Sequence, residues 1–274
     1  MSKIWWVVIA VVVIIVVLLV GGEVVKRQNS PHNQLNDSDN ETKPTVTANF
    51  VDPIKIAAIT KFRSCQGHIV VPQDGTETRS NMKHYLYLKK EFTSARRLVE
   101  LYAPFDGFVS DIYKGDEDFS DRNPASRDLT VSKSKGLRAR SDWGFSFLHI
   151  EPRDGLKEDD AVKAGELLGY VSLELIPPYY AFDVVYAKMG TFPKKIDKWN
   201  SPYAALDSAF AHMDSQTLAK YATLGADSAD DFAIAKTTRD AAPCQYGPDG
   251  RQFSQERDQD WYNDWLGNIN DAIS

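Results

Sequence analysis

Four basic residues lie close together in the middle of an otherwise acidic chain. They are Lys133, Lys135, Arg138 and Arg140. If Lys135-Gly136 forms the tip of a hairpin, the four cations share one rim, an arrangement that suits contact with anionic glycans or phospholipid headgroups. They are therefore candidate binding residues, and the alternative is a solvated hairpin that has no ligand.

The chain contains two cysteines, Cys65 and Cys244. Cys65 stands at the start of an expected early strand, and Cys244 follows Pro243 in an expected turn near the C-terminus. An even number of cysteines in an exported chain favours a disulfide, which would tie the C-terminal segment to the rest of the fold. The alternative is a pair of buried, unpaired thiols.

Composition limits the classes of function. With 274 residues, of which 43% are hydrophobic and 26% charged, the chain can bury a core in one or two domains. The formal charge of -6 and the pI of about 5.4 argue against a nucleic-acid partner, because binding to phosphates needs a surplus of Lys and Arg. The sequence also lacks a Gly-rich phosphate loop and a nucleophile elbow, and Lys188-Met189 does not resemble a lipoyl attachment site.

Residues 1–22 are expected to form a transmembrane signal anchor. Residues 4–20 are all apolar, and as a helix they would be about 25 Å long, enough to cross the hydrocarbon core. A cleaved signal peptide and a buried core helix are the alternatives. Because Lys3 precedes the run and Lys26 and Arg27 follow it, the positive-inside rule gives no orientation. The very short N-terminal flank favours export of the remainder of the chain.

Residues 23–52 are expected to be a disordered polar linker. Residues 28–48 contain almost no apolar side chains, so burial cannot offset the entropy of ordering them. The segment includes two sequons for N-glycosylation, at Asn36 and Asn40, which have meaning only in an exported chain.

Residues 53–192 are expected to form a mainly antiparallel β domain. Short alternating apolar runs are separated by turn residues, as in Pro72-Gln73-Asp74-Gly75. The expected strands span residues 54–62, 67–71, 82–88, 97–102, 107–113 and 179–187.

Residues 193–274 are expected to be a helical extension that packs against the β domain. Ala and other apolar residues recur at helical spacing over residues 202–213, and further helices are expected at 217–224 and 228–236, the last with Ser228 as N-cap. A terminal helix would carry an apolar stripe composed of Trp261, Tyr262, Trp265 and Leu266. A separate helix bundle that binds a partner is the alternative.

Three motifs carry a resemblance to a known family. They read Ala103-Pro104-Phe105-Asp106-Gly107-Phe108-Val109, then Phe147-Leu148-His149-Ile150, then 162–171 (VKAGELLGYV). Together they resemble the duplicated-hybrid-motif barrel-sandwich of lysostaphin-type zinc metallopeptidases, over roughly residues 55–190. The resemblance implies a mainly β barrel-sandwich. Lipoyl domains and membrane-fusion adaptors share part of the same pattern, so fold is implied more strongly than function.

The resemblance also implies a zinc site, which this sequence does not complete. The family binds zinc through a His, an Asp four residues later and the second His of an H-x-H, with another His on the middle strand. His149 matches the middle His, and His84 is the candidate for the first. Leu88 stands at the Asp position, and Tyr179 and Ala181 stand at the H-x-H histidines.

A catalytic zinc needs three protein ligands and an open position for water. We therefore expect no zinc and no other cofactor, and interpret His84 and His149 as structural remnants packed on strands. The alternative is a rearranged metal site drawn from His68, His84, His149 and Asp183. In the interpretation without a metal, Tyr179 and Tyr180 put aromatic surface where the family has its ligands, which suits stacking on sugar or peptide.

The sequence thus favours a membrane-anchored, extracytoplasmic, non-catalytic peptidase-like domain that binds or regulates a cell-envelope component, either a glycan or an envelope protein. An active zinc-dependent envelope peptidase with altered ligands is one alternative. A structural adaptor of an envelope complex is another.

Overall fold

The computed structural model describes residues 43–114, 125–173, 180–254 and 264–272. The predicted anchor 1–22, the sequons at Asn36 and Asn40, and Tyr179 lie outside these residues, as do Trp261 and Tyr262. In the described ranges, no helix is long and apolar enough to cross a membrane.

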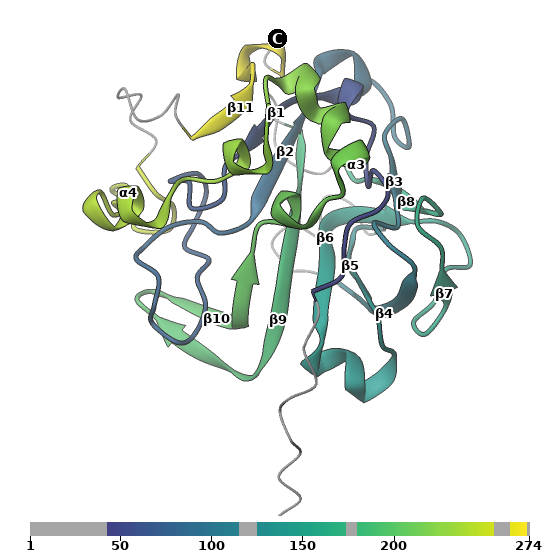
Figure 1. The fold of residues 1–274 in the computed structure, drawn as a ribbon, viewed down its shortest axis with the longest axis horizontal. Coiled ribbons are helices and arrows are strands. Elements are labelled where there is room, and N and C mark those ends of the chain that lie inside the picture. Colours follow the sequence, from purple (N-terminus) through teal and green to yellow (C-terminus); the bar gives the residue numbers. More distant parts are fainter. Residues whose placement is uncertain (1–42, 115–124, 174–179, 255–263, 273–274) are drawn as a thin grey trace, which may run out of the picture. The chain divides into compact units, whose positions relative to one another are not determined.

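The described chain is mainly an antiparallel β structure with few helices, as predicted (Figure 1). Within the described residues, eleven strands join in one sheet, in the order β11-β1-β2-β9-β6-β5-β4-β7, with β10 on β9 and with β8 on β3 and β6. The strands are β1 Ile56–Thr60, β2 His84–Leu88, β3 Glu100–Tyr102, β4 Gly107–Tyr113, β5 Arg127–Ser132, β6 Trp143–Pro152, β7 Ala161–Val162, β8 Leu167–Val171, β9 Ala181–Ile196, β10 Trp199–Asp207 and β11 Trp265–Gly267.

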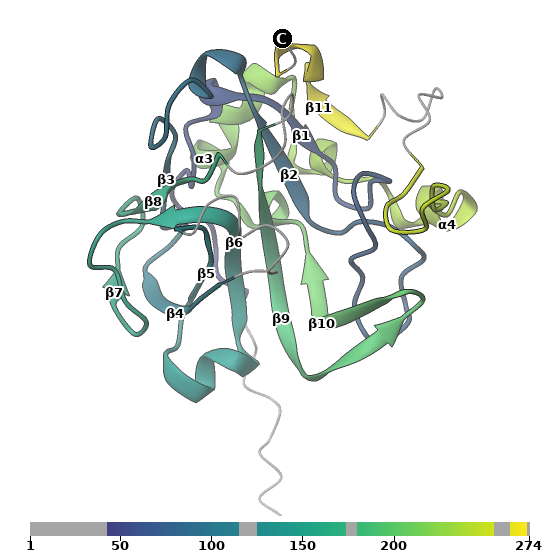
Figure 2. The same cartoon turned by 180° about the vertical axis from the view of Figure 1, so that it is seen from behind.

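The longest strand, β9, lies at the centre of the sheet and pairs with more than two strands along its length. It pairs with β2, β6 and β10, and the reverse view shows it running through the centre (Figure 2). Its first seven residues are all buried, which fits their nearly continuous apolar sequence, whereas the second half is exposed. This second half and the start of β10 form a long arm.

Two of the sequence motifs meet at one edge of the sheet. The Oδ1 atom of Asp106 accepts a hydrogen bond from the backbone N of Ala164 (2.9 Å), and Oδ2 lies 3.0 Å from Nζ of Lys163. Gly165, at φ 79°, donates its N–H to the carbonyl of Ala103 (2.8 Å), a conformation that favours glycine. The strands β4 and β7 pair beside these contacts.

The compact unit begins at residue 43, earlier than the predicted end of the linker at residue 52. Val46, Phe50 and Val51 are completely buried. The Phe50 ring packs 4.9 Å from that of Phe145 and 6.1 Å from that of Phe147, between centroids. Three apolar side chains are therefore enough to dock a segment whose other residues are polar.

The start of the predicted helical extension is a strand. Residues 199–207 pair with β9 over a register that shifts on both sides of Tyr203. Pro202 lies at this irregularity, a position where the missing N–H of proline breaks no regular ladder. The Ala-rich composition predicted a helix here, but pairing with the exposed half of β9 outweighs that local preference.

Short helices follow β10. They are η4 Ala209–His212, α3 Ser215–Ala219, η5 Lys220–Leu224, η6 Ala229–Phe232 and α4 Lys236–Ala241. Ser228 is the N-cap, as predicted, since its side chain and Asp231 form a capping box at η6. The predicted helix over 228–236 is wrong in length, because η6 ends at Phe232 and α4 begins separately at Lys236. The predicted terminal helix is instead the strand β11 at Trp265, which pairs with β1. Its Trp265 packs edge-on against Tyr87, 4.9 Å between centroids.

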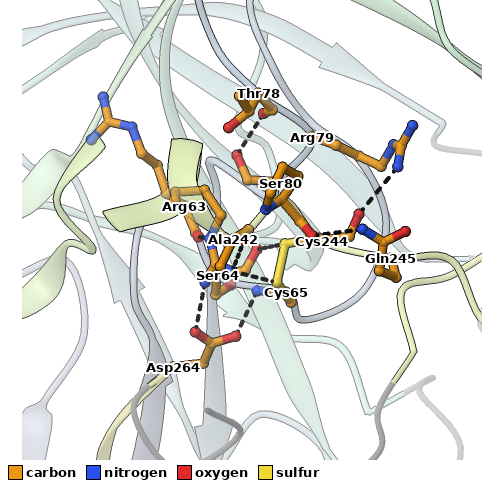
Figure 3. The surroundings of a disulfide bond; sticks show 12 residues. Arg63, Ser64, Cys65, Thr78, Arg79, Ser80, Ala242, Cys244, Gln245 and Asp264 are labelled. Atoms are coloured by element: carbon orange, nitrogen blue, oxygen red, sulfur yellow. Dashed lines mark hydrogen bonds and ion pairs between the residues drawn. A yellow bond between two sulfur atoms is a disulfide. The ribbon is translucent and has the colours of Figure 1, made fainter. Parts of the chain in front are cut away.

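The predicted disulfide between Cys65 and Cys244 is confirmed (Figure 3). The two Cα atoms lie 5.3 Å apart across a separation of 179 residues. A carboxylate oxygen of Asp264 accepts the N–H of Cys65 (2.6 Å), and its other oxygen pairs with the buried Arg239 (3.0 Å). The disulfide thus holds the C-terminal segment against the early part of the chain.

Candidate functional site

A buried ion pair is the central electrostatic feature of the site. The Nζ atom of Lys83 lies 2.5 Å from Oδ2 of Asp183, and the two side chains are 6% and 0% exposed. Tyr85 pairs with Asp183 across β2 and β9, and alternation along the strand puts Lys83 on the same face as Tyr85. Burial by itself would lower the pKa of Lys83, but the negative charge of Asp183 outweighs it and the pKa is raised. Lys83 therefore stays an ammonium ion.

His149 lies beside this pair, at the point where β6 changes its partner. Leu148 pairs with Asp183 of β9, whereas Ile150 already pairs with Val171 of β8. His149 has φ 64°, a conformation that is uncommon for a residue other than glycine and that often marks a functional position. Its Nε2 atom lies 4.0 Å from Oδ2 of Asp183.

Asp128 closes the same corner from β5. Its Oδ1 atom accepts the backbone N–H of His149 (3.1 Å). The register between β5 and β6 shifts at this residue, so Asp128 is free to turn its carboxyl group toward His149. Burial raises the pKa of Asp128.

These residues border a cavity of about 360 Å³. Lys83, Asp128 and His149 contribute to its wall. The rings of His68 and Trp199 stack on one side, 4.7 Å between centroids, and Tyr113 and Tyr203 also line it. Burial lowers the pKa of His68 to about 4, so its ring is neutral at pH 7.

A second cavity of about 400 Å³ adjoins the first. The two share five lining residues, namely Tyr113, Asp128, Leu148, Pro202 and Tyr203. The second cavity extends along η3 Gly136–Ser141, with Asp111 and Glu158 facing Arg140. Burial and then the charge of Glu158 raise the pKa of Asp111. We call the two joined cavities the groove.

His84 does not lie in the groove. It is 1% exposed, and its Nδ1 is 2.8 Å from the carbonyl O of Thr60 and its Nε2 3.0 Å from Oγ of Ser208. Its ring meets that of Phe210 edge-on at 4.9 Å. Because successive residues of a strand face opposite sides, Lys83 points to the groove and His84 to the core. The structure therefore does not bring His84 and His149 together.

The other positions implied by the family resemblance that the structure describes also lie away from the groove. Tyr180 packs against the hydrophobic core and lines neither cavity. Leu88 is completely buried, and Ala181 pairs with Tyr87. The aromatic side chains of the groove are instead those of Tyr113, Trp199 and Tyr203.

The basic segment is a 3-10 helix, η3, where a hairpin tip was expected. Lys133 donates to the carbonyl O of Asp106 (2.8 Å), and Nζ of Lys135 lies 5.5 Å from the centroid of the Phe108 ring. Arg138 is exposed. Of the four basic residues, Arg140 is the one that lines the groove.

The groove does not fit the zinc site of the resembled family. In the described part of the chain, no three His, Cys, Asp or Glu side chains gather as a metal-binding group. The carboxylate of Asp183 is already paired with the ammonium of Lys83, so a cation would have to displace a buried charge to reach it.

Sequence reasoning did not select Lys83, Asp128, Trp199 and Tyr203. A lysine inside the alternating apolar run of residues 82–88 was the available signal, since a buried lysine needs an anionic partner. For Trp199 and Tyr203 the helical interpretation of their surroundings hid the signal.

No protein-family model matches the chain, and neither does any curated protein. Among solved structures, it is similar to a chain described as a glycyl-glycine endopeptidase, LytM, from Ruminococcus gnavus, with 13% identity and a TM-score of 0.28. The match covers 64% of this chain and 62% of that one, less than two thirds of its length. At this identity and TM-score the similarity carries no argument about the groove.

Proposed function

We propose that the protein is a membrane-tethered, extracytoplasmic binding domain that holds a glycan polymer of the cell envelope in its groove without cutting it. The observation that carries this proposal is Lys83, which lines the first cavity and is ion-paired with the fully buried Asp183. The ammonium group of Lys83 supplies a fixed charge at the cavity wall, where it can contribute to recognition of a ligand.

The residues of the groove favour binding over hydrolysis. A zinc hydrolase lowers the pKa of a metal-bound water so that hydroxide is available near neutral pH. Here the positive charge beside Asp183 belongs to an ammonium group, which does not coordinate water in that way. Since the pKa of Lys83 is raised, its amine is not a nucleophile or a base either.

The shape and lining of the groove favour a chain of sugar rings. Each cavity has the volume of a site for one small ligand, and their shared wall suits consecutive units of one polymer. Trp199, backed by His68, offers an aromatic face, and the hydroxyl groups of Tyr113 and Tyr203 with the carboxyl of Asp128 offer hydrogen bonds. The disulfide and the expected anchor at residues 1–22 support an exported location.

The test is calorimetric titration of the full chain in lipid nanodiscs with soluble disaccharide–peptide fragments of peptidoglycan. We expect Trp199→Ala to weaken binding about tenfold, equivalent to about 1.4 kcal/mol of lost stacking. Trp143→Phe is the matched control, because Trp143 stacks on Tyr186 (5.3 Å between centroids) and lines neither cavity. Fragments without sugar that bind equally well would reassign the ligand to peptide. Absence of binding, or equal affinity of wild type and Trp199→Ala, would overturn the proposal.

A further inference from the structure

Two exposed apolar side chains stand out in the described chain. Leu137 in η3 is 82% exposed and Phe192 in β9 is 78% exposed. Among the described residues, the next most exposed large apolar side chain is that of Ile54, at 59%. Single exposed apolar side chains are common, but a group of them at one place on the surface marks a site of contact with another molecule.

Leu137 and the arm of β9 belong to the same end of the sheet. The helix η3 connects β5 to β6, and Leu137 and Met189 line the second cavity together. Both views show the coil of η3 and the bend of β9 and β10 side by side at the end away from β11 (Figures 1 and 2).

Phe192 lies in a bulge of this arm. Ser201 pairs with Lys194 and Tyr203 pairs with Met189, so residues 190–193 of β9 face the single residue Pro202. The extra residues cannot join the ladder and are pushed out of it. The side chain of Phe192 thus projects from the surface at this end.

The two segments that form this end are rich in basic residues, although Asp111, Glu158 and Asp159 border η3 in the second cavity. Residues 133–142 and 188–198 together contain eight Lys and Arg but two Asp, a net charge of +6 in a chain whose total is -6. Arg138 and Lys195 have no ion pair with any residue that the structure describes, so their charges are available to an external anion.

The chain enters the compact unit at this end. The Nζ atom of Lys43 lies 4.6 Å from the centroid of the Trp143 ring, and Trp143 begins β6 two residues after η3 ends. The expected anchor at residues 4–20 is joined through residues 21–42 to this end of the compact unit.

We propose that this basic end, formed by residues 133–142 and 188–198, rests on the anionic lipid headgroups of the membrane that holds the anchor. Leu137 and Phe192 enter the headgroup layer, and the unpaired cations face the phosphates. Each basic residue near an anionic surface strengthens binding about fivefold, and a few apolar side chains among them add to it. The inference rests on the anchor of the proposed function but not on what the groove binds.

The test is hydrogen exchange of the full chain in nanodiscs of phosphatidylcholine, with and without phosphatidylglycerol. We expect slower exchange, by at least fivefold, in peptides covering 133–142 and 188–198 when the anionic lipid is present, and reversal in high salt, which screens the attraction. Equal exchange in both lipids would overturn the inference.

Variants separate this surface from the groove. Phe192→Ser, and Arg138→Gln with Lys195→Gln, should lose the protection while keeping the affinity for disaccharide–peptide fragments within twofold, because none of the three residues lines a cavity. Ile54→Ser is the matched control and should keep both properties. Protection that persists in the variants would also contradict the inference. Binding of disaccharide–peptide fragments without protection by anionic lipid would contradict this inference but not the proposed function. Protection by anionic lipid without fragment binding would contradict the proposed function but not this inference.

Discussion

The side-chain nitrogen of Lys83 lies 2.5 Å from Oδ2 of Asp183, and both side chains are almost completely shielded from solvent. Oδ2 of Asp183 is also 4.0 Å from Nε2 of His149. Neither buried charge has bulk water to solvate it, so each depends on the other for compensation. The pair therefore contributes both to the stability of the fold and to the electrostatic potential in the groove.

Replacing one partner of this pair should destabilise the protein strongly. Lys83→Met leaves the carboxylate of Asp183 buried without a counterion, which we expect to lower the free energy of unfolding by about 3–5 kcal/mol. The double variant Lys83→Met with Asp183→Leu should recover most of the loss, because it removes both charges. Urea denaturation measures both effects, and a double variant less stable than Lys83→Met would refute the assigned role of the pair.

His84 and His149 should behave in opposite ways on substitution. His84→Ala removes a buried, hydrogen-bonded ring and should cost about 2–4 kcal/mol of stability without changing the affinity for glycan fragments. His149→Asn keeps a residue that tolerates positive φ, so it should lower affinity with little loss of stability. The pair of measurements is thermal unfolding and calorimetric titration. Weaker binding in His84→Ala and unchanged binding in His149→Asn would reverse the assignment.

Stability should decrease as the pH falls from about 6.5 to about 4. Burial lowers the pKa of His68 and of His84 from 6.5 to about 4, so in this window the unfolded chain binds protons that the folded chain does not. The two histidines together should lower the free energy of unfolding by up to about 3 kcal/mol for each pH unit in this window. Burial raises the pKa of Asp128 and of Asp264. At these two groups the folded chain binds protons more readily than the unfolded chain, so they offset part of the loss of stability as the pH falls.

His84→Gln isolates one of these contributions. The variant should show about half the histidine-dependent slope when unfolding by urea is measured between pH 7 and pH 4.5. A slope identical to that of the wild type would mean that His84 does not titrate in this way.

Loss of the disulfide should destabilise the protein without changing the groove. Cys65→Ser with Cys244→Ser frees a loop of 179 residues in the unfolded state and should cost about 3–5 kcal/mol in the chain-entropy model. This loss in the free energy of unfolding is measured by urea denaturation of the double variant, compared with the wild type in the presence and in the absence of reductant. A difference below about 1 kcal/mol would show that the bond adds little constraint.

Local chemistry made several features of this fold predictable. The even number of cysteines indicated the disulfide, Ser228 was identifiable as a helix cap, and alternating apolar runs indicated antiparallel strands. Each of these depends on residues near one another in sequence, or on a simple count.

The residues that line the groove could not be predicted, because they depend on the register of the strands, which the sequence does not reveal. Neighbouring residues of a strand face opposite sides of the sheet, so an error of one position along β2 selects a core residue in place of a groove residue. Matching His84 to a metal ligand therefore selected the core residue, whereas its neighbour Lys83 lies at the groove. Trp199 and Tyr203 were missed because residues 199–207 form a hairpin with β9, and this pairing outweighs the local helical preference of the alanines.

The central claim is that the groove binds an envelope glycan and does not cut it. Co-sedimentation of the full chain, in detergent, with isolated peptidoglycan sacculi tests both parts at once, because protein is measured in the pellet and released fragments in the supernatant. The account predicts wild-type protein in the pellet, Trp199→Ala largely in the supernatant, and no released fragments from either. Soluble fragments that appear with wild type and disappear with His149→Asn, or wild-type protein that stays in the supernatant, would contradict it.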